Sequence, residues 1–212
     1  MAHEHSDEAD EDARFFERYY AEAGEDIDAI PWSNLKPHPL LTRWLSGDEA
    51  PRIPTSALVI ASGLGDDAEE LARRGWPVVA FDAAPSAIAW CRRRFPDSPV
   101  DYRVANLFAI PWSWRHAFDV VVENRTIQSL PPARHDAVIA AIAACVAPGG
   151  EVVAIAHGRD DDEPPRDRPW PLSRRELDGF LAQGLVSRSF HDDRSRGHRG
   201  PRLFRAVYRR PG

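Results

Sequence analysis

The chain contains few of the residues that mark several common protein classes. Its 212 residues include only two cysteines, Cys91 and Cys145, which lie far apart and each fall within a helical pattern. They form neither a disulfide framework nor a zinc motif, and small buried side chains are the simpler interpretation. An excess of basic residues is also absent, since 27 Lys and Arg against 33 Asp and Glu give a net charge of −6. This balance argues against a nucleic-acid partner.

Long apolar runs are absent as well. The longest, residues 137–147, is too short to cross a bilayer and is followed by a proline and two glycines. The first residues lack the basic and apolar regions of a signal peptide, so we expect a cytoplasmic protein without a membrane partner. Acidic side chains dominate the beginning of the chain instead, and we predict that residues 1–12 are a disordered, solvated tail.

The rest of the sequence has the pattern of a single α/β domain, residues 13–212. Apolar and β-branched runs alternate with amphipathic stretches, which predicts a parallel sheet with helices on both faces. The predicted strands cover residues 57–62, 77–82, 100–105, 118–123 and 151–157, and the helices between them cover residues 66–74, 85–95 and 132–146. Ligands of such sheets bind beyond the carboxyl ends of the strands, so residues just after each strand are candidates for a site.

Both ends of this domain depart from the alternation. An amphipathic helix with an aromatic stripe is predicted over residues 13–23, and a proline-rich loop and a second short helix follow it. Near the other end, Ser173 and Glu176 have the spacing of a capping box. Two final runs, residues 185–191 and 203–209, predict an antiparallel hairpin that brings the sheet to seven strands.

The first strand leads into a glycine turn that contains Gly63 and Gly65. Asp66 and Asp67 then begin a helix, and the next strand ends at Asp82. An acid about 20 residues beyond a glycine turn is the arrangement of a nucleoside-cofactor site, where it accepts both hydroxyl groups of a ribose.

Two cofactors fit such a site, a nicotinamide dinucleotide and S-adenosylmethionine. Residues 63–68 (GLGDDA) satisfy a loose dinucleotide pattern. However, two carboxylates directly after the glycines would repel a pyrophosphate, and a hairpin stands where a second nucleotide-binding half would be. These features favour S-adenosylmethionine. An NAD(P)-dependent oxidoreductase and a non-catalytic S-adenosylmethionine-binding protein remain the alternatives.

The order and spacing of the motifs resemble those of class I S-adenosylmethionine-dependent methyltransferases. The segments that carry this resemblance are residues 59–65 (VIASGLG), 81–82 (FD), 104–108 (VANLF), 118–123 (FDVVVE) and 146–153 (VAPGGEVV). The chain departs from the family pattern where Val59 replaces an acid, Ala61 a glycine and Asn106 an aspartate. With Val59 in place of the acid, Asp66 is the expected partner of the methionine amino group.

Within this class, the chain loosely resembles the small-molecule branch that includes thiopurine and tellurite methyltransferases. The segments concerned are residues 15–20 (FFERYY), 31–40 (PWSNLKPHPL) and 123–132 (ENRTIQSLPP). The resemblance implies a Rossmann-like, seven-stranded, mostly parallel sheet, S-adenosylmethionine as cofactor and a small-molecule methyl acceptor. It also implies that residues 13–46 form a helical lid.

The site residues implied by the resemblance lie at the strand ends and in the lid. Cofactor binding is expected from Ser62, Gly63, Gly65, Asp82, Ala83, Asn106, Leu107, Glu123 and Asn124. Substrate binding is expected from Trp32, His38, Arg125 and Arg159, with Trp112 and Trp114 as further walls of the pocket. Methyl transfer needs a base only when the nucleophile carries a proton, and His157 is the candidate, with His38 as a second. No metal site is expected.

Overall fold

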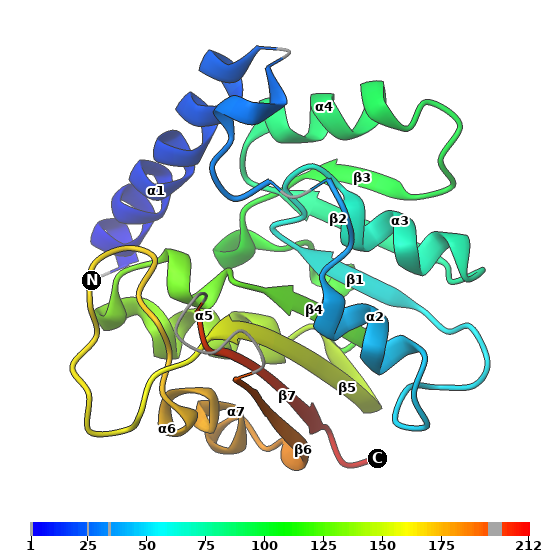
Figure 1. Cartoon of the computed structure of the whole chain (residues 1–212), viewed down its shortest axis with the longest axis vertical. Coiled ribbons are helices and arrows are strands. Elements are labelled where there is room, and N and C mark those ends of the chain that lie inside the picture. The colour runs from blue at the N-terminus through cyan, green and yellow to red at the C-terminus, as the bar shows by residue number, and fades with distance from the viewer. Residues whose placement is uncertain (1, 25, 34, 195–200) are drawn as a thin grey trace.

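The computed structural model describes residues 2–24, 26–33, 35–194 and 201–212, with side chains from residue 12 onward. Its core is a seven-stranded sheet in the order β3-β2-β1-β4-β5-β7-β6 (Figure 1). The strands are β1 (Ala57–Ile60), β2 (Val78–Asp82), β3 (Asp101–Val104), β4 (Phe118–Asn124), β5 (Val146–His157), β6 (Val186–Asp193) and β7 (Leu203–Arg209). Strands β1 to β5 are parallel, and β7 runs antiparallel to both β5 and β6. The predicted sheet and its closing hairpin are confirmed.

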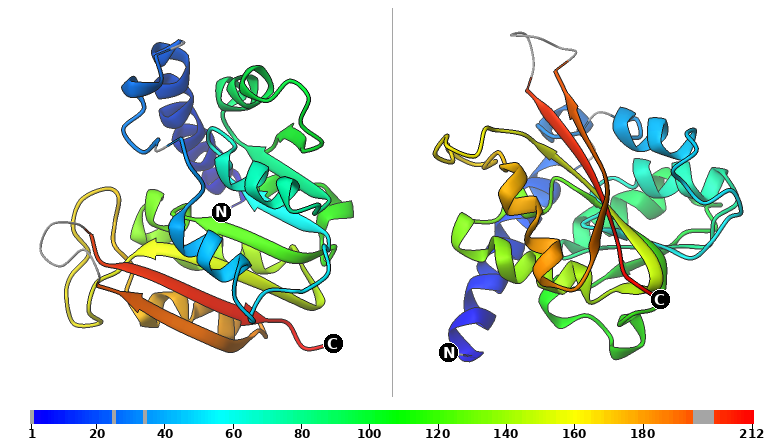
Figure 2. Two further views of the ribbon diagram at one scale, coloured as in Figure 1. Left: turned by 45° about the vertical axis from the view of Figure 1, so that its right-hand side comes forward. Right: turned by 90° about the horizontal axis from the view of Figure 1, so that it is seen from below.

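Helices cover both faces of the sheet, as Figure 2 shows. One face carries α2 (Pro39–Leu45), α3 (Asp66–Arg73) and α4 (Pro85–Arg94), whose Trp44, Leu71 and Ile88 pack on Val59 and Val122. The other face carries α5 (His135–Ala143), α6 (Arg174–Leu177) and α7 (Gly179–Ala182). Because helices cover both faces, every residue of β1 is buried, which explains its continuous apolar run.

Short 3₁₀ turns punctuate the connections. They are η1 (Ile27–Ala29), η2 (Leu107–Ala109), η3 (Trp112–Trp114), η4 (Ile127–Ser129) and η5 (Pro132–Arg134). The helix predicted over residues 132–146 is therefore shorter, because its first three residues form η5 and its last residue already begins β5. The capping box predicted at Ser173 and Glu176 is present at the start of α6.

The beginning of the chain differs from the prediction of a disordered tail through residue 12. Helix α1 spans Ala2–Ala23, so the acidic segment belongs to the same helix as the aromatic stripe. Asp12 forms ion pairs with Arg134 (2.6 Å) and Arg168 (3.2 Å), which tie the helix to the rest of the domain. Figure 1 shows α1 on the same side of the molecule as the loop over residues 158–171. No helix in the described ranges combines the length and apolar character needed to cross a bilayer.

Candidate active site

The carboxylate of Asp82 is fixed at the end of β2, against the glycine turn that follows β1. Its Oδ2 accepts the backbone N–H of Gly63 (3.0 Å), and its Oδ1 accepts that of Ala84 (2.9 Å). The side chain is 6% exposed, and burial raises its pKa although these amides act in the opposite direction. Each carboxylate oxygen has room for a second donor, so Asp82 is suited to receive two ribose hydroxyl groups.

The glycines of the turn are needed for packing as well as for approach of a ligand. Gly65 has φ +90°, and a Cβ atom there would lie 2.5 Å from the Tyr102 hydroxyl, which donates to Glu69 (2.7 Å). Gly63 has φ +54°, and a Cβ atom there would lie 3.2 Å from the Tyr20 hydroxyl. The sequence predicted only the approach of a cofactor, because Tyr20 and Tyr102 come from distant segments.

The other predicted cofactor residues beside β1, β2 and β3 lie around this turn. The hydroxyl of Ser62 is buried and has no hydrogen-bond partner among the described residues. Ala83 is half-buried directly after Asp82. Asn106 begins η2, and its Oδ1 accepts the Phe108 amide (2.9 Å), while Leu107 is buried beside it. The oxygen predicted to accept the adenine amino group therefore already holds one donor and has one acceptor position left.

Glu123 was predicted to bind the cofactor, but its carboxylate binds backbone groups within the protein. Its side chain is fully buried, and its Oε1 accepts the backbone N–H groups of Thr126 and Ile127. Burial raises its pKa to about 7, although these amides act in the opposite direction. Glu123 thus holds the backbone that follows β4, and alternation along the strand leaves its neighbour Asn124 on the opposite face.

Asn124 belongs to a half-buried polar cluster that no local sequence pattern indicated. Its Nδ2 donates to Asp67 Oδ2 (2.7 Å), and the backbone N–H of His38 donates to Asp67 Oδ1 (2.7 Å). Burial raises the pKa of Asp67, against the influence of these hydrogen bonds. The His38 ring is buried, and its Nδ1 caps α2 by accepting the Leu40 amide (3.2 Å). Asp67 therefore joins the N-terminal segment to the end of β4.

Arg125 follows directly and has an unusual backbone, with φ +66°. Its guanidinium group is half-buried, and in the described part of the chain it makes no hydrogen bond and no ion pair. Burial lowers its pKa. Its charge acts on four surrounding groups: Tyr20, Asp67, Glu123 and His157.

His157 is the last residue of β5, next to β4 in the sheet. Its backbone N–H donates to Gln128 Oε1 (2.5 Å), and its carbonyl accepts the Leu172 amide (2.8 Å). Within the described residues its ring makes no hydrogen bond, and its pKa is lowered by burial and by the charge of Arg125. The ring is therefore neutral at pH 7. Gln128 is fully buried, and no sequence pattern pointed to it.

These residues fit the predicted cofactor, since Asp82 offers acceptor positions and buried polar atoms at Ser62 and Asn124 have no partner in the described chain. Residues 57–150 match the family described as methyltransferase domain. A curated relative, the 2-heptyl-1-hydroxyquinolin-4(1H)-one methyltransferase of Mycobacteroides abscessus, is 26% identical over 167 residues, which are 77% of this chain and 72% of that protein. This chain is a class I S-adenosylmethionine-dependent methyltransferase.

Solved methyltransferases share the fold. The Burkholderia thailandensis 1,6-didemethyltoxoflavin-N1-methyltransferase, solved with 1,6-didemethyltoxoflavin and S-adenosylhomocysteine, has a TM-score of 0.71 and 18% identity, and the alignment covers 100% of this chain and 91% of that one. The glycopeptide N-methyltransferase MtfA, solved with S-adenosylmethionine, has a TM-score of 0.65 and 15% identity, with 81% and 93% covered. The prediction of S-adenosylmethionine as cofactor, rather than a dinucleotide, is confirmed.

In this methyltransferase, Trp32 packs against the aromatic stripe of α1. Its Nε1 donates to the Tyr20 hydroxyl (2.8 Å), and its ring contacts those of Phe16, Tyr19 and Tyr20. Glu17 connects the helix to α4 by accepting the Ser86 amide (3.0 Å) and hydroxyl (2.6 Å). Tyr20 thus lies between the aromatic cluster and the glycine turn, a position that the helical stripe alone did not reveal.

Two further tryptophans are not where the sequence analysis expected them. Trp114 is half-buried and packs against the core on Phe81 and Phe118, and Phe118 lies at the beginning of β4, opposite the ligand edge. Trp112 is 82% exposed and contacts Arg115. Neither lines the candidate active site.

Arg159 was predicted to bind substrate, but its guanidinium group is occupied within the protein. It donates to Glu176 (2.6 Å) and to the carbonyl oxygens of Pro171, Asp160 and Glu163. These bonds fasten the loop over residues 158–171 to the beginning of α6. Arg159 therefore supports this loop, and we do not retain it as a substrate residue.

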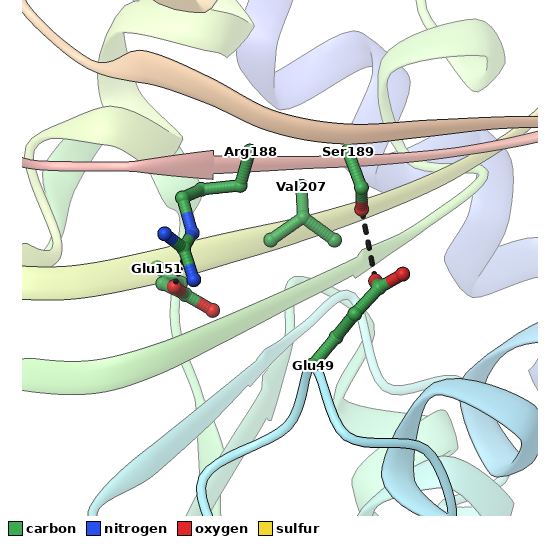
Figure 3. Close-up of a pocket in the computed structure, with 5 residues that line it drawn as sticks. All are labelled: Glu49, Glu151, Arg188, Ser189 and Val207. Atoms are coloured by element: carbon green, nitrogen blue, oxygen red, sulfur yellow. Dashed lines mark hydrogen bonds and ion pairs between the residues drawn. The ribbon is translucent and has the colours of Figure 1, made fainter.

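A small cavity elsewhere in the methyltransferase carries none of the predicted site residues (Figure 3). It has a volume of about 40 Å³ and is lined by Glu49, Glu151, Arg188, Ser189 and Val207. Ser189 bonds Glu49 (2.9 Å) and Arg188 pairs with Glu151 (3.4 Å), so the lining groups already have partners. A space of this size holds a water molecule or two, which excludes a cofactor.

Proposed function

We propose that this methyltransferase methylates a protic oxygen or nitrogen of a small aromatic heterocycle held beside His157. The observation that carries this proposal is the His157 ring, which ends β5 at the ligand edge, is neutral at pH 7 and has no hydrogen-bond partner among the described residues. A neutral imidazole in that position accepts the proton of the nucleophile.

The cofactor supplies a methyl group that its sulfonium centre makes electrophilic. The protein then has to align the nucleophile for an in-line displacement and to keep water away. His157 is the better base of the two predicted histidines, because the Nδ1 of His38 already caps α2. A substrate with an O–H or N–H group loses its proton to His157 as the new bond to carbon forms.

An aromatic acceptor is supported by the side chains that face this end of the domain. Trp32, which follows η1, packs against Tyr19 of α1 with ring centroids 5.1 Å apart, and both are partly accessible. Such rings bind flat heterocycles by stacking. The names of two similar proteins also specify heterocyclic compounds, 2-heptyl-1-hydroxyquinolin-4(1H)-one and 1,6-didemethyltoxoflavin.

The segment over residues 13–46 is proposed to contain the lid that closes over the ligand edge of the sheet. The part before α2 contacts the domain through Glu17, which bonds Ser86, and through the His38 amide, which bonds Asp67, while Tyr20 and Ile30 belong to an apolar cluster with Leu64, Ala87 and Trp90. Helix α2 does not belong to such a lid, because Leu41 and Trp44 are buried in the core of the domain. Arg168 of the loop over residues 158–171 also stacks on the ring of Phe15 (4.3 Å). Opening of residues 13–38 therefore separates these polar contacts and one small apolar cluster, which suits a lid, while α2 stays in place.

The test is a screen for methyl transfer. The purified protein is incubated with S-adenosylmethionine and a panel of hydroxyquinolones, other hydroxylated heterocycles, phenols and thiols, and mass spectrometry follows both products. We expect turnover with a hydroxylated or N–H heterocycle and none with simple thiols. Turnover confined to thiols would refute the acceptor class, and S-adenosylhomocysteine binding without transfer to any compound would favour the non-catalytic alternative.

A further inference from the structure

Two adjacent acids begin helix α3, and the fold gives them different partners. Asp66 forms a two-pronged ion pair with Arg94, at 2.8 and 3.0 Å. Asp67 instead accepts hydrogen bonds from His38 and from Asn124 at the end of β4. The expectation that Asp66 meets the methionine amino group therefore conflicts with its contacts, and Asp67 is the acid that reaches the ligand edge.

Asp67 determines which way the Asn124 amide faces. A carboxylate only accepts, so Asn124 has to turn its Nδ2 group toward it. The Asn124 Oδ1 atom is consequently left buried, with no hydrogen-bond partner among the residues that the structure describes. Buried polar atoms are normally paired, so this oxygen indicates a missing donor.

Arg125 presents the opposite charge one residue further on. Its guanidinium group has five N–H donors, none of which is used in the described chain. Arg125 and Asp67 influence each other electrostatically but do not form an ion pair. Asp67 with its Asn124 amide, and a cation that has no partner among the described residues, together suit a ligand that carries both an ammonium and a carboxylate group.

The order of strands indicates which end of the cofactor lies near Asn124 and Arg125. Adenine is assigned to Asn106 after β3 and the ribose to Asp82 after β2, and β1 with its glycine turn comes next. Neighbouring strands are about 4.8 Å apart, so an extended ligand lying across these ends has its far end over β4. Asn124 and Arg125 are the residues that end and follow β4.

We propose that Asn124, held by Asp67, accepts the α-ammonium group of the cofactor while Arg125 binds its α-carboxylate. These residues then replace the acid that β1 lacks at Val59. The assignment moves Arg125 from the substrate, where the sequence placed it, to the cofactor. It rests on the proposed position of the ribose at Asp82, which is tested separately.

The experiment is calorimetric titration with three ligands: S-adenosylhomocysteine, its deaminated analogue and 5′-methylthioadenosine, which lacks the whole amino-acid group. In Asp67→Asn the new amide donates to Asn124, which turns its own Nδ2 toward the ligand. We expect about a tenfold to hundredfold loss of affinity for S-adenosylhomocysteine, as for other hydrogen bonds to charged groups, with the other two ligands unchanged. Arg125→Met should lower the affinity for S-adenosylhomocysteine and for the deaminated analogue by the same factor.

Asp66→Asn is the matched control and should bind all three ligands as the unmodified protein does. Asn124→Ala removes the acceptor without touching the Asp67–His38 bond, so it replaces Asp67→Asn if that variant does not fold. Equal losses for all three ligands, or no loss for any, would overturn the proposal. Asp82→Ala is expected to lower the affinity for methylthioadenosine as well, because this ligand keeps the ribose. This variant therefore tests the ribose assignment separately from the amino-acid site.

Discussion

The backbone N–H of Gly63 donates a hydrogen bond of 3.0 Å to Oδ2 of Asp82, 19 residues further along the chain. This bond joins the turn after β1 to the end of β2. It means that the acid which should hold the ribose also shapes the glycine turn. Binding of the cofactor and local stability are therefore expected to change together when Asp82 is altered.

Asp82→Ala should abolish measurable binding of S-adenosylhomocysteine. The loss of two hydrogen bonds that the ribose hydroxyl groups donate to the carboxylate, each worth about 1.5–3 kcal/mol, lowers affinity by more than about a hundredfold. The unpaired amides of Gly63 and Ala84 should also lower the free energy of unfolding by about 2 kcal/mol. Calorimetry and urea denaturation measure the two effects. Asp101→Ala, at an exposed position of β3, is the control, and equal affinities of both variants would contradict the assignment.

Ala61→Gly should stabilise the protein. Ala61 has φ +46°, in the left-handed region where a Cβ atom costs about 1–2 kcal/mol. Glycine removes that strain but gains about 0.4–1 kcal/mol of freedom in the unfolded chain. We expect a net increase of about 0.5–1 kcal/mol in the free energy of unfolding by urea titration. The same substitution at exposed Ala137 in α5 should instead cost about 1 kcal/mol. A loss at both positions would show that residue 61 is not strained.

His157→Gln should lower kcat/KM by about 10²–10⁴-fold while binding of S-adenosylhomocysteine stays unchanged. The pKa of His157 lies below its ordinary value of 6.5, because of burial and the charge of Arg125. The unmodified enzyme should therefore gain kcat/KM as pH rises through this lowered pKa and then level off, and the variant should lack this limb. His116→Gln, at an exposed histidine, is the control. A variant of His157 that keeps both rate and pH profile would exclude it as the base.

Glu123→Gln should change the pH dependence of stability. The pKa of Glu123 is raised from 4.5 to about 7, chiefly by burial, so the folded protein binds a proton more tightly than the unfolded chain. The stability that this proton contributes is fully present below pH 4.5 and is lost as pH rises to 7. The variant has no such proton, so its free energy of unfolding should match that of the unmodified protein near pH 4.5 and exceed it at pH 8. Parallel curves for the two proteins would contradict the raised pKa.

The sequence by itself determined the elements whose signals are local. Strand β7 lies over residues 203–209 as predicted, and the capping box of Ser173 and Glu176 needs only three residues of spacing. The alternation of strands and helices fixed the parallel sheet, because covered strands read as apolar runs. The glycine turn and Asp82 indicated the cofactor, since they combine a backbone requirement with a charge at the end of a predicted strand.

The tertiary structure alone decided how equivalent residues differ. Asp66 and Asp67 are identical neighbours in the sequence, yet one pairs with Arg94 and the other with Asn124. Arg125 and Arg159 both follow strands, but among the described residues the guanidinium group of Arg159 has acceptors and that of Arg125 has none. Each difference depends on partners that come from distant segments, and a local pattern carries no information about which segments meet. The sequence therefore indicated the edge at which the chemistry takes place, and the packing of the chain selected the side chains that are left there to perform it.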